Sequence, residues 1–231
     1  LCSIVKTILL CNKKNMKNNL ELQEDVQNAI KWEPSINSSE IGVAVRDGVV
    51  TLSGTVDSYS KKLAAERATK NVIGVRAIAE DINIHYGTTF IKNDTEVASE
   101  VLSAWKNDWE VPDRQIKVRV ENGWVNLEGE VIWMFQKQAA KNAITNLTGV
   151  KGVTNGITLK SESKDTVEKE DITRALDRNW SINGHDIKVE VNQNNVKLTG
   201  KVHSIYQMEE AGRLAWNTPG VNHVENELAV L

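Results

Sequence analysis

The chain has 231 residues, of which 40% are hydrophobic and 26% are charged, and its formal net charge is −3. This composition is typical of a soluble globular protein rather than of a disordered or integral membrane protein. Without an excess of basic residues the chain cannot neutralise many phosphates, so we exclude nucleic acid as its main partner.

The first 19 residues are interpreted as an N-terminal tail. Its apolar run, from Leu1 to Cys11, is far too short to span a bilayer, so no transmembrane segment is expected. No Ala-x-Ala-like cleavage site follows the run. Met16 is a natural start, in which case the residues before it are an upstream extension; a damaged export signal is the alternative. Both cysteines, Cys2 and Cys11, lie in this tail, so no disulfide or cysteine-based metal site is expected in the rest of the chain.

A helix is predicted after the tail, and its apolar face recurs twice more along the chain. The residues of this face are Leu22, Val26, Ala29 and Ile30, then Val97, Val101, Ala104 and Trp105, then Glu168, Ile172, Ala175 and Leu176. Only Glu168 departs from the apolar pattern. Asp94 and Asp165 are expected in the N-cap regions of the second and third copies.

A β-hairpin is predicted next, because apolar and polar residues alternate on both sides of a Gly or Asn turn. The segment Ile41–Gly54 returns 75 residues later as Ile116–Gly129 and, after 71 more, as Ile187–Gly200. A repeat of this length predicts a series of similar small modules rather than one large domain. The glycine that ends each copy is expected to mark a bend or a close backbone approach.

An alanine-rich second helix is predicted from about residue 58 to 71, ended by a glycine C-cap at Gly74 and followed by a last strand. The same order recurs in the other copies, with Gly149 and Gly220 as the C-caps. The chain is therefore predicted to be α+β, with three tandem domains of the order helix-strand-strand-helix-strand. Each domain has two helices packed on one face of a three-stranded mixed sheet. The predicted limits are 1–19 for the tail and 20–87, 92–160 and 165–231 for the three domains.

The hairpin pattern Val-x-Val-x-x-Gly-x-Val-x-Leu-x-Gly, the alanine-rich second helix and the closing Gly-Val resemble the BON domain (bacterial OsmY and nodulation). From Leu20 to Leu231 the chain is similar to an OsmY-like series of three such domains. The resemblance implies association with phospholipid or a membrane surface, and a role in osmotic or envelope stress. It implies the periplasm or cell envelope as the location, whereas the cytoplasm is expected if Met16 is the true start. It supplies no catalytic residues.

No catalytic, metal or cofactor site is expected. The four histidines, His85, His185, His203 and His223, show no metal-ligand spacing. The sequence has no nucleophile elbow, P-loop or dinucleotide motif. We therefore predict a binding protein that is not an enzyme.

Tryptophan is the remaining functional signal, with seven copies against two Phe and three Tyr. Trp105, Trp109 and Trp180 are assigned to helix faces or helix ends and are expected in the core. Trp124 is expected on the exposed face of the second hairpin. A candidate lipid-binding site in the second copy is made of Trp124, Trp133, Met134, Phe135, Lys137 and Lys141.

Two interpretations of this candidate site remain open. Either its apolar side chains pack against a neighbouring module, or they insert into a lipid interface while the lysines face anionic headgroups. The function is accordingly expected to be binding to an anionic phospholipid surface. The alternatives are a soluble stress-protective scaffold that binds proteins or peptides, envelope proteins included, at a sheet edge, and cation sensing through backbone carbonyls.

Overall fold

The computed structural model describes residues 17–87, 92–159, 167, 169–182, 186–221 and 223–231. Within these ranges it contains three α+β domains, each with a three-stranded mixed sheet, which confirms the predicted fold class. We call them module 1 (17–87), module 2 (92–159) and module 3 (167–231). The predictions for residues 1–16 of the tail and for Asp165, Glu168 and His185 lie outside the described residues.

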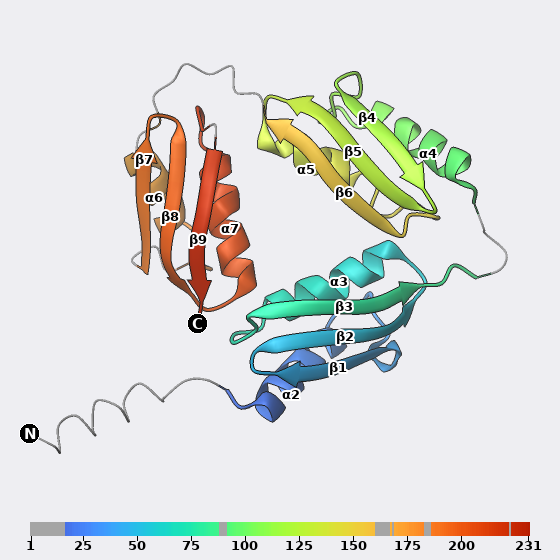
Figure 1. The fold of residues 1–231 in the computed structure, drawn as a ribbon, viewed down its shortest axis with the longest axis horizontal. Helices are drawn as coiled ribbons and strands as arrows, with labels where there is room; N and C mark the ends of the chain where they lie inside the picture. The colour runs from blue at the N-terminus through green and yellow to red at the C-terminus, as the bar shows by residue number, and fades with distance from the viewer. Residues whose placement is uncertain (1–16, 88–91, 160–166, 168, 183–185, 222) are drawn as a thin grey trace, which may run out of the picture.

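Each module contains the predicted order of elements (Figure 1). Module 1 has α2 (Asn19–Lys31), β1 (Ile41–Arg46), β2 (Val49–Val56), α3 (Tyr59–Lys70) and β3 (Ala77–Ile84), with a short 3₁₀ turn, η1 (Ser38–Glu40), before β1. Module 2 has α4 (Asp94–Lys106), β4 (Ile116–Glu121), β5 (Trp124–Val131), α5 (Met134–Asn142) and β6 (Gly152–Leu159). Module 3 has α6 (Lys169–Asp177), β7 (Ile187–Asn192), β8 (Asn195–Val202), α7 (Ile205–Trp216) and β9 (His223–Val230). In each sheet the middle strand pairs antiparallel with the first strand and parallel with the last.

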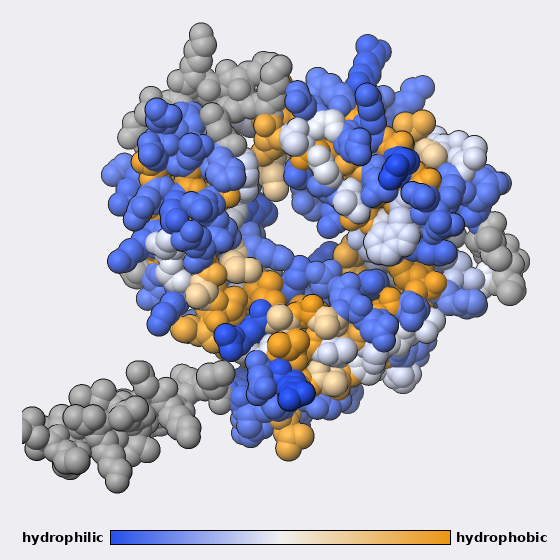
Figure 2. Space-filling view, in the orientation of Figure 1, coloured by the Kyte–Doolittle hydropathy of each residue, from blue (hydrophilic) through white to orange (hydrophobic). Residues whose placement is uncertain are grey.

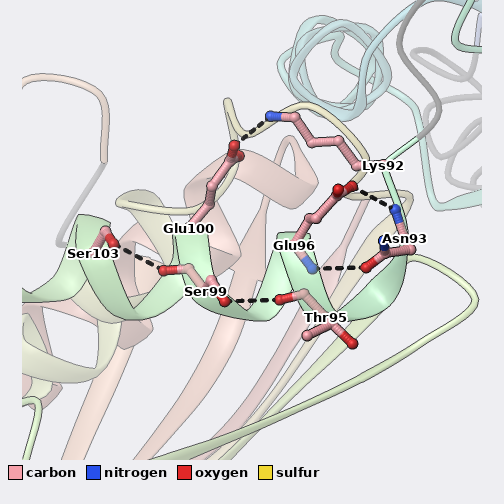
Figure 3. Close-up of polar contacts among 7 residues, drawn as sticks. All are labelled: Lys92, Asn93, Thr95, Glu96, Ser99, Glu100 and Ser103. Carbon is pink, nitrogen blue, oxygen red and sulfur yellow. Dashed lines mark hydrogen bonds and ion pairs between the residues drawn. The ribbon is translucent and has the colours of Figure 1, made fainter.

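Helix α4 begins with a capping box one residue before the predicted position (Figure 3). Asn93 Oδ1 accepts a hydrogen bond from the Glu96 backbone N at 2.9 Å, and Glu96 Oε2 accepts one from the Asn93 backbone N at 3.0 Å. Asp94 instead accepts hydrogen bonds from the backbone N atoms of Asn122 and Gly123, at 2.7 and 2.9 Å. Its carboxylate therefore ties the start of the helix to the hairpin turn of the same module, rather than capping the helix.

The glycines at the ends of the repeated hairpin segments are sites of close backbone approach, as predicted. Gly54, Gly129 and Gly200 have φ values of 140°, 146° and 137°. A Cβ atom at these positions would lie 2.0, 2.3 and 2.1 Å from the backbone carbonyl oxygen of the residue just before the neighbouring strand, Glu40, Gln115 and Asp186 respectively. Only glycine fits this conformation without strain.

The three modules lie around a central opening, which the space-filling view also shows (Figures 1 and 2). Helices α3, α5 and α7 lie on the inner side of each module, and strands β1, β4 and β7 lie on the outer side (Figure 1). Strands β3, β6 and β9 each run toward the next module around the ring (Figure 1). The modules thus follow one another head to tail around the opening (Figure 1).

Candidate functional site

Two of the junctions in the ring are made by equivalent residues. We define the docking edge of a module as the first residue of its second helix together with the last residue of its last strand. Tyr59, at the docking edge of module 1, is 7% exposed and belongs to the core cluster of module 2, against which Ile84 also packs. Ile205, at the docking edge of module 3, is 8% exposed and belongs to the cluster of module 1, together with Val230. Module 1 therefore docks on module 2, and module 3 docks on module 1.

Polar contacts accompany this apolar packing. Lys70 Nζ of module 1 forms an ion pair with Glu209 Oε1 of module 3 at 2.7 Å. Burial lowers the pKa of Lys70, but hydrogen bonds to Glu209 and Glu66 outweigh this effect, so the net pKa shift is upward. At the other junction the Tyr86 hydroxyl donates a hydrogen bond to the Val150 carbonyl oxygen.

Both tyrosines at the junction of modules 1 and 2 make it sensitive to alkaline pH. Burial raises the pKa of Tyr59 and of Tyr86 above the usual value of 10.0. Because the pKa of each tyrosine is raised, its protonated hydroxyl favours the docked state. This contribution to docking is fully present below the ordinary pKa and is lost as the pH rises through the raised pKa. We expect small-angle scattering to show an expanded protein above about pH 10. The double variant Tyr59→Phe/Tyr86→Phe should remain compact there, and expansion of this variant at the same pH would contradict the assignment.

The structure brings together five of the six residues predicted as a lipid site and leaves Trp124 apart. Trp124 begins β5 and Trp133 follows its end, so the strand places them roughly 25 Å apart. Trp124 is half exposed, as predicted, and its ring lies against Gly152, where a Cβ would come within 2.3 Å of it. Trp133 and Phe135 are 44% and 46% exposed at the start of α5.

The two lysines of the predicted site lie on the same helix. Burial lowers the pKa of Lys137, because the ammonium group is partly removed from water. Within the described ranges neither Lys137 nor Lys141 forms an ion pair. Helix α5 therefore carries two cations that no described side chain neutralises, Lys137 in its first half and Lys141 in its last turn.

A second group of tryptophans is more exposed than the predicted site. Trp109 and Trp180 were expected in the core, and this prediction is wrong, because they are 88% and 97% exposed. Trp32 is 84% exposed in the corresponding loop of module 1. Each of these three residues follows or caps the end of its module's first helix. Buried Val111 and Ile182, two residues after the tryptophans in modules 2 and 3, hold the loops to the core instead.

The three exposed tryptophans follow the repeat of the sequence closely but not fully. Trp109 and Trp180 are separated by the same 71 residues as the repeat. Trp109 and Trp180 therefore occupy equivalent positions of modules 2 and 3, and Trp32 lies two residues before the equivalent position of module 1.

No group of three or more His, Cys, Asp and Glu side chains in the described ranges is placed to hold a metal ion. None of the described helices combines the length and the apolar character needed to cross a bilayer.

Comparison with known proteins identifies a family and a relative. The BON domain family matches residues 18–86, 93–161 and 164–231. "Osmotically-inducible protein Y" of Escherichia coli (strain K12) is 29% identical over 150 residues, which cover 63% of this chain and 75% of the relative.

Two solved structures of CdsD, described as a structural protein of the type III secretion system of Chlamydia trachomatis, are each 14% identical to the chain. They cover 91% and 93% of it, and it covers 92% and 100% of them. The TM-score is 0.23 for both, so these structures add nothing to the functional assignment.

Proposed function

Because the chain belongs to the BON domain family through three successive domains, we propose that it is a non-enzymatic protein that binds the surface of an anionic phospholipid membrane in the cell envelope. The name of its relative, Osmotically-inducible protein Y, supports a role in the response to osmotic stress. The proposal depends on one observation: each module presents one tryptophan that is at least 84% exposed, at the end of its first helix.

An exposed indole ring favours the interface between water and lipid, because it has a large apolar surface and a polar N–H group. Transferring such a side chain out of water contributes roughly 2 kcal/mol or more. When one ring has bound a membrane, the contacts of the other two rings of the same chain are effectively intramolecular. A ring of three modules can therefore bind vesicles tightly although each contact alone is weak.

The charges near the three tryptophans are mixed. A basic residue stands within three positions before each of them: Lys31, Lys106 and Arg178. Each such cation contributes about 1 kcal/mol of attraction to an anionic leaflet. Acidic neighbours such as Glu33 and Asp108 oppose this attraction. We therefore expect a preference for anionic lipid, with most of the affinity supplied by the rings.

The test is a titration with lipid vesicles in which binding is measured by co-sedimentation. Anionic and neutral vesicles are compared. The triple variant Trp32→Ala/Trp109→Ala/Trp180→Ala is expected to lose at least 10-fold in partitioning onto anionic vesicles. Trp124→Ala is the matched control, because it removes an exposed ring outside the three loops. Unchanged binding by the triple variant would refute the proposal for these loops.

The sequence-predicted site at the start of α5 is tested in the same assay. If Trp133→Ala/Phe135→Ala weakens binding while the triple variant does not, the lipid contact lies at α5, with Lys137 and Lys141 beside it. If the native protein binds neither kind of vesicle, the scaffold function is favoured. In that case crosslinking should trap a polypeptide at an edge strand, since β1, β4 and β7 each pair on one side only within the described sheets.

A further inference from the structure

A cavity lies at the junction where module 3 docks on module 1. Its volume is about 800 Å³, within the range of roughly 300–1,000 Å³ that is usual for the sites of small ligands. Ile73, Gly74 and Arg76 of module 1 and His203 and Leu231 of module 3 contribute to its lining. The Gly74 backbone N donates a hydrogen bond to the His203 carbonyl oxygen at 3.4 Å, which holds the two walls to each other. The cavity therefore belongs to the junction itself.

The junction of modules 1 and 2 is equivalent to this one and gives a direct comparison. Leu231, on the wall of the cavity, corresponds to His85, because each follows the last strand of its module. Their backbone N atoms also make the same hydrogen bond to the end of the middle strand. The Leu231 N donates to the Val202 carbonyl oxygen at 2.9 Å, and the His85 N donates to the Val56 carbonyl oxygen at 2.8 Å. The residue after His85 therefore shows what a docked junction accommodates beside this wall.

That residue is Tyr86, a half-buried phenol ring whose hydroxyl donates a hydrogen bond to the Val150 carbonyl oxygen. By the repeat, Val150 corresponds to Val75 of module 1, and both valines are completely buried. Gly74 and Arg76, on either side of Val75, contribute to the lining of the cavity. A ring placed like Tyr86 at the junction of modules 3 and 1 therefore falls at this cavity, with the Val75 carbonyl oxygen as its acceptor.

We propose that the cavity between modules 3 and 1 is a binding site for a phenol group, whose hydroxyl donates a hydrogen bond to the Val75 carbonyl oxygen. The lining suits such a ligand, because it combines the apolar side chains of Leu22, Ile73 and Leu231 with polar groups. A phenol has the same combination of an apolar ring and one polar end. The bound ring contacts both modules, so it fastens module 3 to module 1 as Tyr86 fastens module 1 to module 2.

The test is a titration of the full chain, followed by two-dimensional NMR, with 4-hydroxybenzyl alcohol and with benzyl alcohol, which lacks only the phenol hydroxyl. We expect 4-hydroxybenzyl alcohol to shift the amide signals of Gly74, Arg76 and Leu231 until they saturate. Benzyl alcohol should bind about 3- to 10-fold more weakly, which is the effect of one neutral hydrogen bond. N-acetyl-tyrosinamide distinguishes the sources of the phenol. Tighter binding of this probe assigns the site to a tyrosine side chain, and weaker binding assigns it to a free phenolic molecule.

A pair of variants at the equivalent junction completes the test. Tyr86→Ala removes the ring there and is expected to create a second site, seen as new ligand-dependent shifts of the Gly149 and Lys151 amide signals. Tyr86→Phe is the matched control, because it keeps the ring, and it should show no second site. The proposal is overturned if 4-hydroxybenzyl alcohol causes no saturable shift at Gly74 and Arg76 of the native chain, or if benzyl alcohol binds equally well. A Tyr86→Ala protein that gains no second site would contradict the correspondence between the two junctions, and with it the proposal.

Discussion

Replacing Trp105 with alanine is expected to unfold module 2 and to release the docking edge of module 1 from it. The indole ring is completely buried, and its Nε1 donates a hydrogen bond to the Ala140 carbonyl oxygen at 2.9 Å. Truncation of a buried tryptophan costs about 3–5 kcal/mol, and it also leaves the Ala140 carbonyl without its partner. A domain of this size seldom has more than about 3–5 kcal/mol of stability. The cost of the substitution is thus comparable to the whole stability of the module.

Unfolding in urea is monitored by two-dimensional NMR, in which amide signals report on each module separately. Trp109→Ala is a closely matched control, because it removes the same side chain four residues later on the chain, where the ring is 88% exposed. We expect its free energy of unfolding to change by less than about 0.5 kcal/mol. If both variants unfolded at the same urea concentration, the burial of Trp105 would not be what stabilises module 2.

The contrast between these two tryptophans shows what helical periodicity predicts and what it does not. Val97, Val101, Trp105 and Trp109 are spaced four residues apart, so the sequence alone places all of them on one helical face. The helix ends at Lys106, however, so only the first three lie on that face. Trp180 was misplaced for the same reason, since α6 ends at Asp177. Periodicity identifies a face, but it does not say where the last turn stops.

The fold of each module could be predicted because short-range patterns determine it. The alternation of the hairpins and the three glycines after them specify strand pairing locally. The junctions depend instead on how whole modules are placed, which no local pattern encodes. The available signal was that all three second helices begin with a large apolar residue: Tyr59, Met134 and Ile205. The sequence analysis offers packing against a neighbouring module only for Met134, whereas the structure buries Tyr59 and Ile205.

Replacing Gly129 with alanine is expected to destabilise module 2 by about 3 kcal/mol or more, because a left-handed non-glycine residue and a backbone clash coincide there. The backbone has φ of 146°, and a Cβ atom would lie 2.3 Å from the Gln115 carbonyl oxygen and 3.1 Å from Ile116 Cα. Ile116 is also the register partner of Gly129 in the pairing of β4 with β5. The clashing atoms therefore cannot move away without breaking the end of the hairpin.

Gly152→Ala is the control for Gly129→Ala in the same module, because its added Cβ atom would clash with a side chain rather than with the backbone. A Cβ atom at Gly152 would come within 2.3 Å of the Trp124 ring, but this ring is half exposed and can rotate into solvent. Its substitution should cost about 1 kcal/mol, in the range of an ordinary point mutation. The same NMR-detected urea titration should therefore give a much lower midpoint for Gly129→Ala than for Gly152→Ala. Equal midpoints would mean that the backbone at Gln115 can move away from the added Cβ atom. The glycine that ends each repeat would then be required for a reason other than close backbone approach.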